Sequence, residues 1–326
     1  MNLKNEIFDI NGEDEFNKRA LSIFNFQYEN VSIYKSYVDH KKIDPKSINH
    51  YTDIPCLPIR FFKSNNIIAK DKKEIITFLS SGTTNQARSK HLVHDVNLYQ
   101  KSFLKTFEQN YGNVEDCIIL ALLPSYQEQG NSSLIYMADE LIKNSGHQLS
   151  GYLSINNEET IDKINKLKDQ KVILIGVSYA LLDLAENVEL PPLSSWIIME
   201  TGGMKGRKKE IVRDELHLIL REKYQCENIH SEYGMTELLS QAYAKTNGEF
   251  YSPSWMKILV RELEDPLSYT SFGKTGGVNI IDLANLYSCS FIETQDLGRV
   301  NENGSFNILG RYDQAEVRGC NLLSFN

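Results

Sequence analysis

Four hydroxyl side chains surround a single glycine at one point of the chain, directly after an apolar segment. The apolar segment, Ile75–Leu79, is rich in β-branched and aromatic residues, which is typical of a strand. Gly82 can adopt a positive φ and lets a ligand approach the backbone closely. Backbone amides and the hydroxyls of Ser80, Ser81, Thr83 and Thr84 can bind phosphate, and Arg88 and Lys90 add positive charge. The segment predicts a strand followed by a phosphate-binding loop, with an ordinary Ser/Thr-rich surface turn as the alternative.

The glycine spacing of this loop differs from the two best-known nucleotide-binding motifs. A Walker A motif requires a second glycine where this chain has Ala87. Phe272–Thr275 ends like a Walker A motif, but Ser268 stands in the place of its first glycine. Thr201–Gly206 does not have the glycine spacing of a dinucleotide-binding loop. Both interpretations are therefore rejected.

A second polar segment, Ser231–Glu237, also follows an apolar run. Tyr233 can stack on a base, the hydroxyl of Thr236 can contact a phosphate, and the carboxylate of Glu237 can bind Mg²⁺. The alternative is a packed turn in which Tyr233 lies in the core and Glu237 caps the turn or faces solvent.

Apolar strands alternate with amphipathic helices through most of the chain, which predicts a parallel or mixed sheet covered on both faces. The predicted strands are Ile75–Leu79, Lys90–His94, Cys117–Leu123, Lys171–Val177 and Ser195–Glu200. The predicted helices are one or two within 14–40, then Asp95–Asn110, Ser132–Lys143, Ile161–Lys168, Tyr179–Leu184 and Arg207–Lys223. Two prolines make 53–62 extended. Ligands of such folds bind beyond the carboxyl ends of the strands, where the loops after Leu79, Leu123, Glu200 and Ile229 lie.

The pattern changes after about Ser254 to short strands and turns. The strands expected there are Lys257–Glu262, Gly277–Asp282, Ser290–Glu293, Gly298–Asn301 and Ser305–Leu309. The predicted domains are an α/β core over 1–253, a β-rich subdomain over 254–313, and a tail over 314–326 that carries Cys320.

Composition restricts the function classes. The chain has 326 residues and a net charge of −8, which argues against a nucleic-acid partner. Its five cysteines form no paired pattern, and neither a signal peptide nor a membrane span is evident, so a cytoplasmic protein without a membrane partner is expected. His217 and His230 are interpreted as packing or capping residues, with a zinc site that includes Cys226 as the alternative.

The two polar segments occur together with two further motifs, Glu293–Arg299 and Gly310–Asp313. In this order the four motifs resemble the adenylate-forming superfamily of acyl and aryl acid ligases, which includes phenylacetate-CoA ligases. Further segments resemble its acyl-protein synthetase branch, the fatty-acid-activating component of bacterial bioluminescence reductases. These segments are Pro124–Tyr126, Gly130–Ser133, Glu200–Arg207 and Glu316–Cys320. The resemblance implies the large N-terminal α/β domain of these enzymes, with mixed sheets, flanking helices and a small β subdomain, and without their C-terminal lid domain.

The resemblance also implies roles for individual residues, with ATP and Mg²⁺ as the ligands. The ATP phosphates would contact Ser80, Ser81, Gly82, Thr83, Thr84 and Lys90. The adenine would be framed by Gly202, Gly203 and Tyr233, and the ribose hydroxyls would be bound by Asp296 and Arg311. Thr236 would contact the α-phosphate and Glu237 would bind Mg²⁺. The pocket for the acid would be bordered by Tyr126, Gly130 and Ser132.

The activity implied is ATP-dependent activation of a carboxylic acid, expected to be a fatty acid, to an acyl-AMP. Cys320 would then accept the acyl group as a thioester and pass it to a partner such as a reductase. An acyl- or aryl-CoA ligase, a carrier-protein ligase and an adenylate-binding protein without turnover are the alternatives. The chain departs from the family pattern at Asn85, which replaces a glycine, and at Arg88, near a usual proline. The adenylating lysine of the lid has no counterpart, and Lys205, Arg207 and Arg299 are the candidates to replace it.

Overall fold

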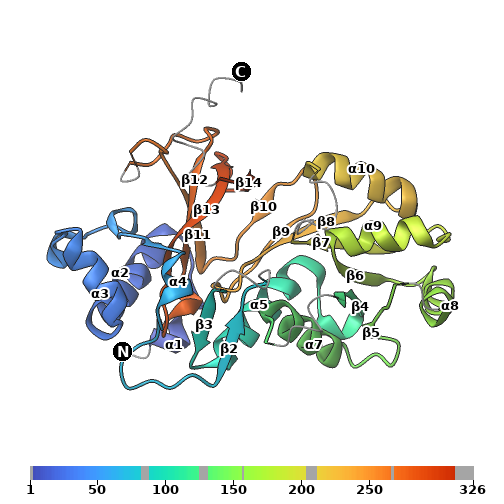
Figure 1. The fold of residues 1–326 in the computed structure, drawn as a ribbon, viewed down its shortest axis with the longest axis horizontal. Helices are drawn as coiled ribbons and strands as arrows, with labels where there is room; N and C mark the ends of the chain where they lie inside the picture. Colours follow the sequence, from blue (N-terminus) through green and yellow to red (C-terminus); the bar gives the residue numbers. More distant parts are fainter. Residues whose placement is uncertain are drawn as a thin grey trace. The chain divides into compact units, whose positions relative to one another are not determined.

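The computed structural model describes residues 3–81, 88–124, 131–155, 158–202, 211–265 and 268–312. The chain divides into two compact units that do not follow chain order (Figure 1). One unit combines Met1–Ile75, His91–His94 and Tyr251–Asn326, and the other combines Ile76–Lys90 with Asp95–Phe250. The N-terminal segment belongs with the last strands because β1 (Leu57–Pro58) pairs in parallel with β13 (Phe291–Val300), with Leu57 opposite Ile292.

The central unit, 76–90 and 95–250, is built on a parallel sheet. Its strands are β4 (Ile118–Leu122), β5 (Gly151–Tyr152), β6 (Val172–Val177), β7 (Ile197–Thr201) and β8 (Ile229–Tyr233), in the order β5-β4-β6-β7-β8. All four pairings are parallel, and β9 (Ala242–Ala244) then runs antiparallel to β8. Every residue of β4, β6 and β8 is buried, as expected for strands covered on both faces.

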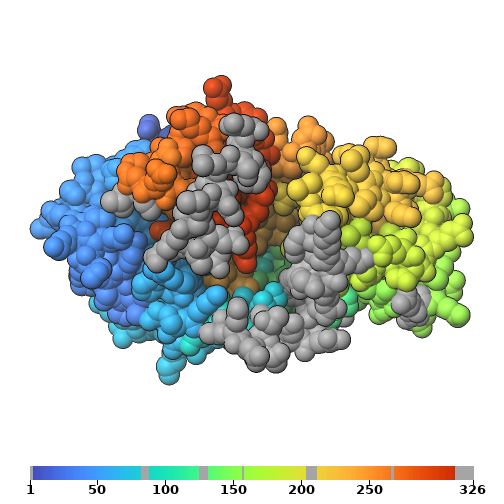
Figure 2. Space-filling view, turned by 45° about the horizontal axis from the view of Figure 1, so that its top comes forward, coloured from blue at the N-terminus to red at the C-terminus, as the bar shows by residue number. Residues whose placement is uncertain are grey.

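Helices cover both faces of this sheet. They are α5 (Val96–Tyr111), α7 (Ser133–Ser145), α8 (Glu158–Leu167), α9 (Ser178–Asn187) and α10 (Arg213–Tyr224). Figure 1 shows α9 and α10 on one face and α5 and α7 on the other. The outer side of α10, yellow in Figure 2, lies at the surface, where Glu222 and Lys223 are exposed. The side chains of Asp95 and Ser132 cap α5 and α7 by accepting hydrogen bonds from the first backbone amides.

The predicted helix Arg207–Lys223 starts later than expected. Residues 207–210 lie outside the described residues, and Val212, with φ −71° and ψ 152°, is still extended. The helix begins at Arg213, where Asp214 and Glu215 place negative charge in the first turn and so favour the helix start.

The core of this unit is largely apolar, and its large aromatic side chains make hydrogen bonds through their polar atoms. Trp196 is fully buried and its indole nitrogen donates to the carbonyl of Leu167 at 3.1 Å. The hydroxyl of Tyr224 donates to the carbonyl of Leu181 at 2.9 Å. Both aromatic side chains therefore fill the space between sheet and helices with their polar atoms satisfied.

The other unit contains an antiparallel sheet and N-terminal helices. The sheet runs β11 (Met256–Arg261), β12 (Gly276–Asp282), β13 and β14 (Phe306–Arg311). Its helices are α1 (Leu3–Glu6), α2 (Glu13–Asn30), α3 (Ser32–His40) and α4 (Phe61–Ser64), and its 3-10 turns are Pro45–Ser47, Tyr51–Asp53 and Leu283–Asn285.

The central unit also contains the 3-10 turn Val114–Asp116 and the strand β2 (Ile76–Leu79). The strands β3 (Lys90–Val93) and β10 (Phe250–Tyr251) lie where the chain passes from one unit to the other. None of the helices in the described part of the chain is long and apolar enough to cross a lipid bilayer.

Two of the sequence predictions for the unit with the antiparallel sheet are wrong. The strands predicted at Ser290–Glu293 and Gly298–Asn301 are two halves of one strand, β13, whose register against β14 shifts between Leu297 and Gly298. Such an irregularity interrupts the alternation of polar and apolar residues on which the prediction rested. The segment 53–62 is not extended throughout, because α4 begins at Phe61.

Gln27 on α2 should contribute strongly to the stability of this unit. Its buried side chain donates to the carbonyls of Asn285 and Leu286 at 2.9 and 3.0 Å and accepts from the backbone amide of Ser290 at 3.0 Å. We expect Gln27→Leu to lower the free energy of unfolding by roughly 2–4 kcal/mol, because buried backbone groups lose their partners. Urea unfolding measures this loss. Asn25→Leu, at an exposed position of the same helix, is the control, and equal losses in both variants would contradict the assignment.

Candidate functional site

Two segments singled out in the sequence lie at the carboxyl ends of neighbouring parallel strands. Strand β7 ends at Thr201 and β8 at Tyr233, and Thr201 lies opposite Glu232 in the register. Gly202 follows β7 directly, is exposed, and has a φ of +68°, which favours glycine. Gly202 and Tyr233 are thus brought to the same edge of the sheet, the place where parallel α/β sheets bind ligands.

Tyr233 is buried, which agrees with the packed-turn alternative for its side chain. Its ring lies 5.8 Å from the ring of Phe250 between centroids, and the guanidinium carbon of Arg213 lies 4.9 Å from the Phe250 ring centroid. Most of the tyrosine ring is therefore covered by protein, and only a small part of its surface is open to a ligand.

Thr236 and Glu237 lie in the turn that follows β8. Thr236 is half-buried, and Glu237 is only 6% exposed. The turn is closed by a hydrogen bond from the amide of Leu238 to the carbonyl of Met235 at 3.1 Å. A carboxylate and a hydroxyl in one turn are hard oxygen donors of the kind that Mg²⁺ prefers.

A buried carboxylate at the end of β7 organises the surrounding polar groups. Arg213 Nε lies 3.0 Å from Glu200 Oε1, and His217 Nε2 lies 3.6 Å from the same atom. Burial opposes ionisation of Glu200, but the nearby His217 side chain and the Arg213 charge together hold its pKa below the ordinary value. The Ser178 hydroxyl lies 3.2 Å from Glu200 Oε2 and 3.0 Å from the carbonyl oxygen of Gly202. This network therefore fixes the backbone that leads into the glycine segment.

Ser178 and Arg213 are not among the site residues predicted from the sequence. A charged residue at the end of an otherwise apolar strand, as Glu200 is, was the available signal, because a buried carboxylate requires partners. Which partners it has depends on how α9 and α10 pack on the sheet.

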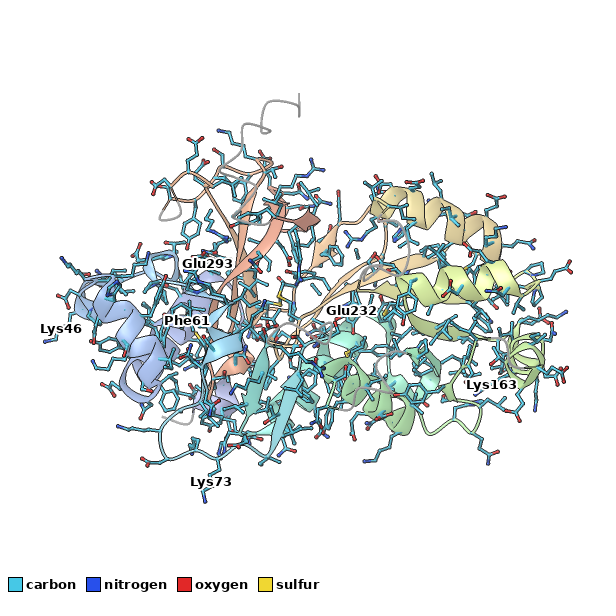
Figure 3. All side chains as sticks on the ribbon, in the orientation of Figure 1. Lys46, Phe61, Lys73, Lys163, Glu232 and Glu293 are labelled. Carbon is cyan, nitrogen blue, oxygen red and sulfur yellow. The ribbon has the colours of Figure 1, made fainter. Side chains whose placement is uncertain are left out.

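Glu232, labelled in Figure 3, is a second buried carboxyl group in this region. The Thr201 hydroxyl donates a hydrogen bond to Glu232 Oε2. Burial raises the pKa of Glu232 to about 7, and the nearby charge of Glu200 acts in the same direction.

The histidines occupy structural positions, as the sequence analysis expected. His217 Nε2 lies 3.1 Å from the Ser231 hydroxyl, and His230 Nδ1 lies 3.2 Å from the hydroxyl of Tyr111. Burial lowers the pKa of His230 to about 4. The Cys226 thiol instead contacts the carbonyl of Trp196. Within the described ranges no three His, Cys, Asp or Glu side chains group as a metal site, so the zinc alternative has no support there.

Three hydrogen bonds that involve Ser80 join the two ends of the predicted phosphate loop. Its amide donates to the carbonyl of Ser89 at 3.0 Å, and its hydroxyl accepts from the amide of Ser89 at 2.9 Å. Arg88 Nε donates to the carbonyl of Ser80. Arg88, which departs from the family pattern, thus helps to join the two ends of the loop. Ser81 is exposed and Lys90 is half-buried, whereas Gly82, Thr83 and Thr84 lie outside the described residues.

The residues predicted for the acid pocket are described only in part. Ser132 is buried and caps α7 by accepting from the amide of Ile135 at 3.4 Å. Its neighbour Asn131 accepts a hydrogen bond from the amide of Leu79 at 2.9 Å, which ties this segment to the start of the phosphate loop. The other predicted residues of the site that lie outside the described residues are Tyr126, Gly130, Gly203, Lys205, Arg207 and Cys320.

The predicted ribose-binding pair lies in the other unit, and its two members are in contact there. Asp296 on β13 and Arg311 on β14 lie opposite each other in the register, with Arg311 Nε 3.1 Å from Asp296 Oδ1. The aspartate is 4% exposed, whereas the arginine side chain is 74% exposed. A buried carboxylate beside an exposed guanidinium can accept hydrogen bonds from hydroxyls.

Arg261 on β11 supports this pair from within the sheet. Its guanidinium is 2% exposed and donates to the carbonyls of Val278 and Thr294 at 2.9 and 2.8 Å. It also donates to the hydroxyl of Tyr312, the residue after Arg311. This role could not be predicted from the sequence, because Arg261 precedes β13 and β14 by about thirty to fifty residues of chain.

Solved structures of acyl-CoA ligases share this fold. ATP-bound MatB from Rhodopseudomonas palustris matches with a TM-score of 0.55 and 18% identity, over 72% of this chain and 47% of that chain. An open conformation of 2-hydroxyisobutyryl-CoA ligase, in complex with 2-HIB-AMP and CoA, matches with a TM-score of 0.66 and 10% identity, over 92% and 71% of the two chains. O-succinylbenzoate coenzyme A synthetase (MenE) from Bacillus subtilis, in complex with AMP, has a TM-score of 0.50 and 18% identity, over 75% and 50%. The chain thus spans about half the length of MatB and MenE.

The sequence comparison adds a more particular family. Residues 7–110 match the family model described as acyl-protein synthetase, LuxE. No curated protein matches the chain. The family match and the fold together support the resemblance to adenylate-forming enzymes and to their acyl-protein synthetase branch, and the predicted fold of their large α/β domain is confirmed.

Proposed function

We propose that the chain catalyses the ATP-dependent activation of a carboxylic acid, a fatty acid in the first instance. A carboxylate oxygen of the acid attacks the α-phosphorus of ATP, the bond to the bridging oxygen breaks, and pyrophosphate leaves. The product is a mixed anhydride, acyl-AMP. This step is needed because a carboxylate has no acceptable leaving group for direct displacement by a thiol.

One observation carries the proposal: the Gly202 segment and the Tyr-Gly-x-Thr-Glu segment meet at adjacent strand ends of a fold that ATP-bound MatB shares. The other two structures compared contain AMP or 2-HIB-AMP, which are ligands of the same chemical type. Parallel sheets of this kind bind nucleotides at their carboxyl edge. The match of residues 7–110 to acyl-protein synthetases supports an acyl acid as the second substrate.

The residues proposed to contact ATP divide between its three parts. Gly202, Gly203 and Tyr233 would frame the adenine, and Asp296 with Arg311 would hold the ribose hydroxyls. The phosphates would be bound by Ser80, Ser81, Gly82, Thr83, Thr84 and Lys90, with Thr236 at the α-phosphate. Tyr126, Gly130 and Ser132 would border the acid. Hydroxyl and amide donors near the α-phosphorus would stabilise the charge that develops there.

The turn after β8 fits a magnesium ion by the chemistry of its donors. Glu237 supplies a largely buried carboxylate and Thr236 a hydroxyl, and both are oxygen ligands. Bound Mg²⁺ would supply positive charge to the phosphate oxygens of ATP. Glu237 would hold the ion. A cation is also required where larger ligases use a lysine of their lid, and Lys205, Arg207 and Arg299 remain the candidates.

The proposed second step uses Cys320. Its thiolate attacks the acyl carbon of acyl-AMP, the bond to the phosphate oxygen of AMP breaks, and AMP leaves. The thioester then passes the acyl group to a partner, for which a reductase or a carrier protein fits the family match. Coenzyme A as a direct acceptor is the second candidate, favoured by the CoA-bound ligase of the same fold.

The first test is carboxylate-dependent exchange of labelled pyrophosphate into ATP, with Mg²⁺, across fatty and aryl acids. We expect exchange with fatty acids in the wild type and in Cys320→Ala, with covalent acylation lost only in the variant. Covalent labelling is measured by mass spectrometry of the intact chain, and Cys289→Ala, which changes a buried thiol, is the control.

The other results discriminate between the alternatives. Exchange without covalent labelling of either protein would replace the cysteine step by direct transfer to coenzyme A or a carrier. ATP binding without exchange for any acid would contradict turnover by the isolated chain and favour an adenylate-binding protein.

A further inference from the structure

Glu232 connects the two backbone segments that are proposed to frame the nucleotide. It precedes Tyr233 and Gly234 on β8, and its carboxyl group accepts a hydrogen bond from Thr201, which precedes Gly202 on β7. Both connections lie within the central unit, at the carboxyl edge of the sheet. Figure 3 labels Glu232 among the interior side chains of this region.

The carboxyl group also lies directly against Gly234. A Cβ atom added to Gly234 would come within 2.5 Å of Glu232 Oε1, far inside ordinary contact distance. Gly234 has no left-handed φ, and a larger residue there would have to displace the Glu232 carboxyl group. One oxygen of Glu232 therefore accepts a hydrogen bond from the β7 segment, and the other lies close to the backbone after β8.

Four of the described titratable groups on neighbouring elements interact with Glu232. Glu200 on β7 raises the pKa of Glu232, against the opposite effect of the Thr201 hydrogen bond, and Glu232 in turn raises the pKa of Tyr99 and Tyr111 on α5 and of Tyr243 on β9. None of these four is a cation, and Glu200 is already paired with Arg213. An ionised Glu232 would repel the Glu200 carboxylate across the β7–β8 pair and add negative charge beside a site for a polyphosphate.

We propose that Glu232 is a positioning residue that, in its uncharged form, holds the Thr201–Gly202 and Tyr233–Gly234 segments at the spacing that ATP requires. It acts through these segments and does not itself contact ATP. The inference rests on the proposed nucleotide site. It adds that ATP binding depends on one buried proton, which is lost as the pH rises.

The sign of the pH effect on folding follows from the same group. The ordinary pKa of the carboxyl group is 4.5, and in the folded chain it is raised to about 7. Between these two values the folded chain holds one more proton than the unfolded chain, so stability contributed by this group falls as the pH rises from roughly 4.5 to 7. Glu232→Gln keeps the size and hydrogen bonding of the acid and removes this dependence.

The test measures ATP binding by calorimetry, together with Tm, for the full chain at about pH 6 and about pH 8.5. From about pH 6 to about pH 8.5 we expect the Kd of the wild type for ATP to rise about tenfold more than the Kd of Glu232→Gln. Over the same range the difference in Tm, Glu232→Gln minus wild type, should increase. Glu222→Gln, at an exposed position on α10, is the matched control and should follow the wild type.

Thr201→Val provides a second test, whose outcome does not depend on whether Glu232→Gln folds. Loss of the hydroxyl should weaken ATP binding about fivefold, and Thr201→Ser should restore it, because the hydrogen bond to Glu232 is regained. The same pH dependence in the wild type and in Glu232→Gln, or normal binding by Thr201→Val, would overturn the inference and leave the proposed function intact. Absence of ATP binding at both pH values in the wild type would overturn both.

Discussion

Glu237→Gln is expected to lower acid-dependent pyrophosphate exchange by about 10²–10³-fold, which would be the largest effect of any single substitution on activity. Glu237 is buried in the turn after β8, in one turn with the Thr236 hydroxyl. The amide keeps the size of the side chain but removes the negative charge that would hold Mg²⁺. The loss should therefore be accompanied by a higher Mg²⁺ concentration for half-maximal exchange.

Exchange rates are measured over a magnesium titration at saturating ATP and acid, with Tm recorded to establish that the variant is folded. Glu227→Gln, which changes a carboxylate that is 94% exposed shortly before β8, is the control and should leave exchange unchanged. A folded Glu237→Gln protein that retains exchange within a few-fold, with an unaltered magnesium dependence, would contradict the proposed role.

Arg261→Met is expected to cause the largest loss of stability, roughly 3–5 kcal/mol. The buried guanidinium joins three strands, because it extends from β11 to the Val278 carbonyl on β12 and the Thr294 carbonyl on β13. Its remaining bonds go to Asn279 Oδ1 at 2.7 Å and to the hydroxyl of Tyr312. Methionine matches the length of the side chain but removes the guanidinium donor from these acceptors, of which the Val278 carbonyl still accepts from the Thr294 hydroxyl at 2.7 Å.

Urea unfolding of the full chain measures the loss. Arg261→Lys should recover only part of it, since an ammonium group cannot reproduce the planar fork of the guanidinium. Arg299→Met, at an exposed position on β13 where one hydrogen bond to Asn307 is lost, should cost about 1 kcal/mol or less. An Arg261→Met variant as stable as Arg299→Met would show that the network contributes little.

Gly277 supplies an independent check on the position of Arg261. A Cβ atom at Gly277 would lie 2.5 Å from the guanidinium carbon of Arg261. The glycine is therefore explained by the stacked guanidinium rather than by a turn. The same guanidinium reaches the carbonyl of Thr294 on β13, the strand that pairs with β14 and so brings Asp296 and Arg311 together.

Local chemistry in the sequence was sufficient for most of the elements. Asp95 and Ser132 cap α5 and α7 at the starts of two predicted helices, because an N-cap depends only on residues a few positions away. The buried strands β4 and β6 were recognisable as continuous apolar runs. Predictions were wrong where a longer-range contact matters. The register shift against β14 concealed the continuity of β13.

The order of the polar motifs along the chain was enough to indicate an adenylate-forming fold, and the residue types were enough to suggest phosphate and magnesium chemistry. The tertiary structure decided which side chains meet. Thr201 and Glu232 are in contact only because β7 and β8 pair in one particular register, and Asp296 faces Arg311 for the same reason on β13 and β14. A one-residue slip in either pair would turn these side chains to the opposite face. Such contacts depend on strand register and packing, which residue types along the chain do not encode locally.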